Sequence, residues 1–309
     1  MRSSGRSTYG KGMSDIFPAR GFALEGQRCR VHVIDVTTGA DRIVFETDEI
    51  LLEAPNWAPE GLLLNGGGLL WALDPDAADP ALAEVPFPTV PTLNNDHVLV
   101  PGSDDILLSA NDGQIYRAPR GGGEAIRLTD PADPFMHFLH GVDPDATLIA
   151  YTALAFVDGT AQHGGIRVAN IDGSMDRPIT PGQVADGSEW SPDGQWIYLN
   201  TEHFSEAPGH AQIARMRVDG TELDQLTFDE RVNWFPHFAS DGETAVYLSY
   251  PPGTEGHPAD LEVEVRLVRG GQWRHPETVA TLPGGQGTIN VNSWAPDGSR
   301  FAYVDYPVG

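Results

Sequence analysis

The sequence predicts an all-β protein, a six-bladed β-propeller with four antiparallel strands in each blade. Three observations predict this fold. A short pattern recurs six times, a second strand–turn–strand signal follows most copies, and the N-terminal part of the chain can supply the strands that the last copy lacks. Four short strands in about 45 residues is the period of a propeller blade.

The recurring pattern is an aromatic or large apolar residue, a small residue, a Pro-Asp-Gly type turn and then an alternating apolar run. The copy EWSPDGQWIYLN (189–200) shows it most fully. Pro presets φ at the turn, Asp bonds its own backbone and Gly accepts positive φ, so each copy predicts a hairpin. The equivalent anchor residues lie 42, 43, 48, 48 and 56 residues apart: Pro59, Pro101, Pro144, Pro192, Ser240 and Pro296.

The blades follow in order from these anchors. Five are expected at 53–86, 94–130, 137–181, 186–228 and 233–282. The last copy supplies only two strands, near 291–295 and 299–305, and CRVHVIDVTTGADRIVFE (29–46) has the form of the two missing outer strands. We therefore expect residues 288–306 and 29–47 to form one blade that closes the ring. Residues 29–309 are then one propeller domain, and 1–28 are a partly disordered leader in which Met13 is an alternative start.

Two segments carry a resemblance to a known family. SPDGQWIYLNTE and QIARMRVDGTELDQLTFD resemble the TolB-type propeller repeat, and nearly the whole chain from residue 29 fits it. The repeat implies the fold and not a particular function. It is also similar, more distantly, to the propellers of oligogalacturonate lyases, a family in which a His-rich Mn²⁺ centre supports cleavage of uronate chains by β-elimination.

Composition excludes several classes of function. The formal net charge of −25 disfavours nucleic acid and anionic membranes as partners. The one lysine, Lys11, lies in the leader, which excludes lysine-based Schiff-base and phosphate-loop chemistry in the propeller. Cys29 is the only cysteine and is expected to be a small buried residue. No secretory signal and no membrane span is visible, so we expect a soluble, cytoplasmic protein.

Histidines are concentrated where a propeller normally carries function. Eight of the ten fall in loops that lead into an innermost strand or that join the second and third strands, and both sets of loops open at one end of the channel. They are His97, His137, His140, His163, His203, His210, His237 and His257.

Register against the anchors selects four candidate catalytic residues. His97 and His140 occupy the same repeat position, and Glu189 and His237 share the next one. We expect these four side chains to line one cavity at the channel mouth. Two chemistries stay open: His97, His140 and His237 with a carboxylate hold a divalent cation (Mn²⁺, Zn²⁺ or Ca²⁺), or Glu189 and a histidine form a metal-free acid/base pair. The structural alternative for Glu189 is a hydrogen bond to a neighbouring blade.

A second group is expected to bind substrate. Trp234 stands outside the repeat register in a loop, where its ring suits stacking on a sugar, and Asp96 is placed to orient His97. The group comprises Asn95, Asp96, His137, Asn233, Trp234, His257, Asn290 and Asn292. The sequence therefore favours a carbohydrate-active hydrolase or lyase that acts on an oligosaccharide or a sugar-derived small molecule. The alternative is a non-catalytic scaffold that binds a ligand or a protein.

Overall fold

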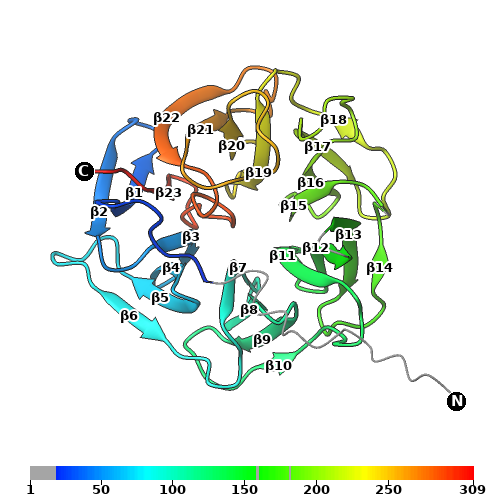
Figure 1. The fold of residues 1–309 in the computed structure, drawn as a ribbon, viewed down its shortest axis with the longest axis horizontal. Coiled ribbons are helices and arrows are strands. Elements are labelled where there is room, and N and C mark those ends of the chain that lie inside the picture. The colour runs from blue at the N-terminus through cyan, green and yellow to red at the C-terminus, as the bar shows by residue number, and fades with distance from the viewer. Residues whose placement is uncertain (1–18, 158–159, 181) are drawn as a thin grey trace, which may run out of the picture.

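The chain forms a ring of six antiparallel sheets around a central channel (Figure 1). The computed structural model describes residues 19–157, 160–180 and 182–309, and no helix occurs in these ranges. The predicted all-β propeller is confirmed. Most of the predicted leader, including Lys11 and Met13, lies outside the described residues.

Five of the sheets contain four strands, and each sheet is continuous in sequence. Blade one contains β3 (Leu52–Ala58), β4 (Gly61–Gly66), β5 (Leu69–Leu73) and β6 (Leu82–Val85). Blade two contains β7 (Leu93–Leu99), β8 (Asp105–Ala110), β9 (Ile115–Pro119) and β10 (Ile126–Arg127). Blade three contains β11 (Met136–Val142), β12 (Leu148–Val157), β13 (Thr160–Asn170) and β14 (Arg177–Pro178). Blade four contains β15 (Ala185–Trp190), β16 (Trp196–Thr201), β17 (Gln212–Arg217) and β18 (Asp224–Gln225). Blade five contains β19 (Val232–Phe238), β20 (Ala245–Tyr250), β21 (Leu261–Val268) and β22 (Glu277–Gly284).

The sixth blade closes the ring with both ends of the chain. β1 (Cys29–Asp35) lies between β2 (Asp41–Thr47) and β23 (Arg300–Asp305), and it pairs with both antiparallel. The predicted closure is therefore confirmed. Figure 1 shows the C-terminus beside β1 and β23.

The innermost segment of the sixth blade is less regular than predicted. The expected strand near 291–295 is reduced to one bridge, between Trp294 and Phe301. The amides of β23 instead bond to carbonyls at uneven intervals, from Val304 to Thr288 and from Ala302 to Ser293. Because the segment loops between these carbonyls, it cannot form a continuous ladder.

Apolar side chains fill the space within and between the blades. The repeat tryptophans Trp57, Trp190 and Trp294 are buried, as predicted for core residues, and Cys29 is buried as well. At the hairpin turns the Asp193 carboxylate accepts the amide of Gln195, which is the structural role expected for the turn aspartates. In the part of the chain that the structure describes, no helix has the length and apolar character needed to cross a membrane.

Candidate functional site

The largest cavity lies at the end of the channel where the innermost strands begin. Its volume is about 510 Å³, and we call it the mouth cavity. A second cavity of about 310 Å³, the side cavity, shares Asn94, Asn95, His257, Pro258 and Gln286 with it. A third, the far cavity of about 280 Å³, lies where the innermost strands end. Clefts of the size of the mouth cavity suit a small molecule.

One repeat position supplies a wall residue from every blade. The residue six positions before each anchor lines the mouth cavity or the side cavity, and we call this set the mouth ring. Its members are Glu53, Asn95, Phe138, Asp186, Trp234 and Asn290. Trp234, expected to stand outside the repeat register, is therefore in register with the other ring residues.

A bulge in each innermost strand directs these side chains. The ladder to the second strand is irregular at the same repeat position in three blades: between Glu53 and Asn56, between Asp186 and Glu189, and between Trp234 and His237. In β7 and β11 the irregularity spans other positions, Leu93 to His97 and Leu139 to Gly141. Ala54, Gly187 and Phe235 follow ring residues and have positive φ of 52°, 63° and 56°. A bulge breaks the alternation of a strand and re-aims its side chains.

Gly187 shows why one bulge needs glycine. A Cβ at this position would lie 2.5 Å from Oδ1 of Asn200, closer than real Cβ contacts. That oxygen accepts the amide of Phe235 in the next blade. The bulge therefore sits directly against an inter-blade hydrogen bond.

His140 and Asp186 form a buried ion pair on the cavity wall. Nε2 of His140 lies 2.8 Å from Oδ1 of Asp186, and the two side chains are 3% and 20% exposed. Although burial disfavours the charged imidazole, Asp186 and Asp96 raise the pKa of His140 to about 9. Burial opposes ionisation of Asp186 too, but His140 holds the pKa of its carboxyl well below the usual range. The pair is therefore charged at neutral pH.

Asp96 is a second buried carboxyl on the same wall. It is 3% exposed, and its Oδ1 has no hydrogen-bond partner among the described residues. Burial raises the pKa of Asp96 to about 7, with the charge of His140 opposing the shift. The sequence prediction that Asp96 orients His97 is not supported, because no contact between their side chains is present in the described structure. Asp96 instead shares the wall with His140.

An aromatic and amide wall faces these acids. The ring of His257 lies 4.4 Å from that of Trp234 and 5.2 Å from that of Phe235. His257 Nδ1 donates to the side-chain oxygen of Gln286, and its Nε2 lies 3.8 Å from Asp186. Burial lowers the pKa of His257, so this imidazole is neutral at pH 7.

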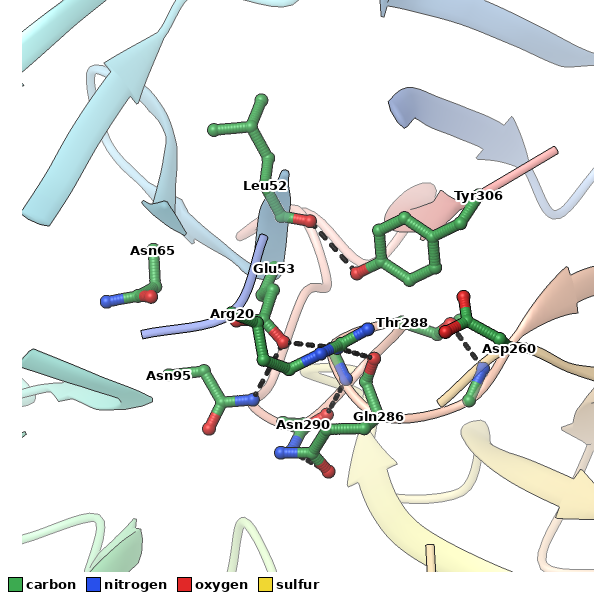
Figure 2. Close-up of polar contacts among 12 residues, drawn as sticks. Arg20, Leu52, Glu53, Asn65, Asn95, Asp260, Gln286, Thr288, Asn290 and Tyr306 are labelled. Carbon is green, nitrogen blue, oxygen red and sulfur yellow. Dashed lines mark hydrogen bonds and ion pairs between the residues drawn. The ribbon is translucent and has the colours of Figure 1, made fainter. Parts of the chain in front are cut away.

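The side cavity contains an arginine from the segment before β1. Figure 2 shows Arg20 between Glu53 and Gln286: its guanidinium donates to Oε1 of Glu53 at 2.5 Å and to the Gln286 carbonyl. Asn95 also donates to Glu53, at 3.5 Å. Asn290 donates to the side chain of Gln286, which accepts His257 as well. Asn95 and Asn290, which were predicted to bind substrate, thus line the cavities.

His97 does not join the site. It lines none of the three cavities described above, it is 1% exposed, and neither ring nitrogen has a partner among the described residues. Burial lowers the pKa of His97 to about 4, so it is neutral. It matches His140 in repeat position, but the bulges in β7 and β11 span different residues. The two side chains therefore point to different places.

Glu189 and His237 bond the blades to one another. The Glu189 carboxylate accepts His237 Nδ1, the Phe238 amide at 2.9 Å and the Asn292 amide group at 2.8 Å. His237 Nε2 in turn donates to the Ile289 carbonyl at 2.8 Å. Glu189 and Asn292 line the far cavity, not the mouth cavity. His140 lines the far cavity as well as the mouth cavity, but His97 and His237 line neither, so the described structure does not bring the four predicted residues into one cavity. The geometry favours the structural alternative for Glu189.

Two other predicted residues lie inside the blades. His137 Nδ1 bonds the Gly113 carbonyl at 2.8 Å, and its ring packs edge-on against Tyr151. Asn233 is fully buried, and its side chain bonds Asp229 and Ser249. Neither residue lines the mouth cavity. Each residue directly precedes a mouth-ring residue in its strand, and its side chain is occupied by hydrogen bonds within the blades.

The predicted metal ligands are not assembled. Among the described residues, no three His, Cys, Asp or Glu side chains form a group that could hold a metal ion. His97 and His237 are each buried in a different setting from His140, as described above. The described structure therefore does not confirm the predicted ligand set His97, His140 and His237.

Sequence reasoning missed the acidic partner of the site. Asp186 lies in the segment ADGSE, directly before the Gly187 bulge. Repeat register instead selected Glu189, in the same segment, as the catalytic carboxylate. Phe235, Gln286 and Arg20 were missed as well. Counting back six residues from every anchor would have found Asp186, because it selects the whole mouth ring.

Comparison with known proteins gives the family. No family model matches the chain. An uncharacterized protein of Agrobacterium fabrum, Atu1656, is 37% identical over 290 residues, which are 90% of this chain and 92% of that protein. A solved structure from Agrobacterium tumefaciens, whose TolB name is provisional, is 34% identical with a TM-score of 0.80, over 91% of this chain and 99% of its own.

The chain belongs to the TolB-like β-propeller family.

More distant structures share only the fold with this TolB-like propeller. TolB from Acinetobacter baumannii is 13% identical with a TM-score of 0.52, and the match covers 91% of this chain and 64% of that one. An oligogalacturonate lyase in complex with manganese is 13% identical with a TM-score of 0.54, over 89% and 78% of the two chains. These similarities establish the architecture of the TolB-like propeller. Its chemistry has to be inferred from its own residues.

Proposed function

We propose that this TolB-like propeller is an enzyme that performs acid–base chemistry on a hydroxylated, sugar-derived small molecule in the mouth cavity. One observation carries the proposal: the unpartnered buried oxygen of Asp96 lies on the cavity wall beside the charged His140–Asp186 pair. A buried carboxyl oxygen without a hydrogen-bond donor costs stability, so such groups concentrate at functional sites.

The three side chains suit different tasks. With a pKa of about 7, Asp96 exchanges a proton readily at neutral pH, which is the property of an efficient general acid or base. His140, held charged, can donate a hydrogen bond to a developing negative charge. Asp186 is a positioning residue, because Thr152 and the Gly187 amide also donate to its Oδ1 and fix the carboxylate. This set supports hydrolysis or elimination and uses no metal ligand.

The shape of the wall supports a sugar-like ligand. Trp234, Phe235 and Phe138 provide apolar faces, and Asn94, Asn95 and Asn290 provide amide groups around the same space. Pockets that combine a few polar groups with aromatic walls are typical of small-ligand sites.

The test is turnover on a panel of neutral glycosides and sugar lactones, read by product analysis. Asp96→Asn should lower turnover about 10²-fold. Glu84→Gln, which neutralises an exposed carboxylate on β6, is the matched control and should leave turnover unchanged. If ligands bind in the mouth cavity but none is converted, the chain is a binding scaffold and the enzymatic proposal is wrong.

A further inference from the structure

The mouth cavity carries a net negative charge. Its described wall contains four carboxylates, Asp96, Asp186, Glu202 and Glu255, and no lysine or arginine. His140 offsets Asp186 through their ion pair. In the ranges that the structure describes, no ion pair involves Glu202 or Glu255, and the Glu202 carboxylate accepts the Gly209 amide at 3.0 Å. The remaining charge of the wall is therefore negative.

Asp96 gives an independent sign of a ligand. Its Oδ1 is buried without a donor, on the wall of this same cavity. A carboxylate oxygen accepts hydrogen bonds only, and the donors that satisfy it best carry a positive charge.

Aromatic side chains lie beside the acids. Trp234 and Phe235 both line the mouth cavity, with ring centres 5.6 Å apart. The face of an aromatic ring attracts a cation, and the attraction strengthens when the site is shielded from water. Carboxylates and aromatic faces together are the pair of groups that recognises an organic ammonium ion.

The side cavity already holds such a pairing. Glu53 is the mouth-ring residue of blade one, as Asp186 is of blade four, and its carboxylate binds the guanidinium of Arg20. The Arg20 guanidinium also lies 5.4 Å from the centre of the Tyr306 ring. An acidic ring position next to an aromatic ring thus receives an organic cation from the chain itself (Figure 2).

We propose that the mouth cavity recognises a small organic cation, an ammonium group on a hydroxylated body, through Asp96, Glu202 and Glu255. The inference rests on the proposed function because it names the ligand class of the same site. This ligand class differs from the uronate chains of the lyases, since the unpaired carboxylates of the cavity would repel an anionic sugar.

The test compares three sugars of one shape at pH 7 by calorimetry. Glucosamine is mostly protonated, glucose is neutral and glucuronate is anionic. We expect glucosamine to bind at least about 10-fold more tightly than glucose, glucuronate to bind most weakly, and added salt to reduce the preference for glucosamine. Asp96→Asn should reduce that preference about 10-fold and Glu255→Gln about threefold, whereas Glu84→Gln should leave it unchanged.

Several results would overturn the inference. They are equal binding of glucosamine and glucose, tighter binding of glucuronate, a preference that survives both Asp96→Asn and Glu255→Gln, or no binding of glucosamine at all. Because binding is measured without turnover, the two proposals fail separately. If glucosamine binds preferentially but no sugar is converted, only the enzymatic proposal is wrong. If neutral sugars are converted but glucosamine is not preferred, only the cation proposal is wrong.

Discussion

Nε2 of His140, on β11, lies 2.8 Å from Oδ1 of Asp186 at the start of β15, so the pair joins the third and fourth blades at the channel mouth. The same carboxylate accepts Thr152 Oγ1 at 2.6 Å. Its other oxygen lies 3.8 Å from His257. Asp186 therefore connects β15 with β11 and β12 and lies near two histidines. Its removal should change the position and charge of several groups in the site.

Asp186→Asn should discharge His140 at neutral pH. Without the carboxylate, burial dominates, so the midpoint of the imidazole titration should fall from about 9 to below 7. In the native protein the folded-state pKa of His140 exceeds its unfolded value of 6.5. Its charge therefore stabilises the fold fully below pH 6.5 and this contribution is lost as pH rises through 9. NMR of the histidine ring protons against pH measures the midpoint, and an unchanged midpoint contradicts the pairing.

Asp96→Asn should stabilise the protein while it damages the site. The folded pKa of Asp96 is about 7 against an ordinary value of 3.8, so the native state resists ionisation. The cost of holding the carboxylate grows as pH rises from about 4 to 7, and its removal should add about 4 kcal/mol at pH 8 but only about 1.5 kcal/mol at pH 5. Urea denaturation at both pH values measures this. The groups that face Asp96 are His140, Asp186 and Glu53. A gain independent of pH would mean that the pKa of Asp96 is the same in the folded and unfolded protein.

Glu189→Gln should weaken the ring and leave the mouth cavity intact. The carboxylate accepts from His237, the Phe238 amide and Asn292, and an amide NH₂ in its place would face one of these donors. We expect a loss of about 2–4 kcal/mol in unfolding free energy, with turnover of any substrate within twofold of the native value. Glu84→Gln controls for the change in charge. Normal stability combined with lost turnover would restore Glu189 to the catalytic site.

Removal of residues 1–47 should abolish cooperative unfolding. The deletion takes away β1 and β2, so β23 loses its strand partner and its edge is left unpaired. Removal of residues 1–12, which precede the predicted propeller, should leave the melting temperature unchanged. Thermal unfolding followed by circular dichroism compares the two. A sharp transition in the 48–309 protein would show that the ring does not need this closure.

Sequence reasoning was strongest where a position has one physical role in all blades. The turn residues around Pro192 and the tryptophans Trp57 and Trp190 had to form hairpins and core, and they do. Ring closure followed from a deficit of strands, since an open propeller exposes edges. The histidine-rich loops predicted a site at one end of the channel, and three of their histidines, His140, His163 and His257, line the mouth cavity there.

The identity of the site residues could not be obtained in the same way. Repeat register against the anchors grouped Glu189 and His97 with His140, but β7, β11 and β15 each contain a bulge that shifts the direction of their side chains. Gly187 marks one bulge in the sequence, whereas Ala54 and Phe235 adopt positive φ without any such mark. Local sequence does not fix these conformations, since they depend on hydrogen bonds to the next blade.

By itself, the sequence determined the blade number, the closure and the end of the channel where polar groups gather, because these depend on local turn chemistry and on a repeat period. Only the tertiary structure decided that Asp96, His140 and Asp186 share a wall while Glu189 and His237 bond blades together. The physical reason is that a bulge adds one residue to a strand, which turns a side chain from an inter-blade interface towards the channel. The neighbours among which that side chain is buried then determine its pKa and therefore its charge.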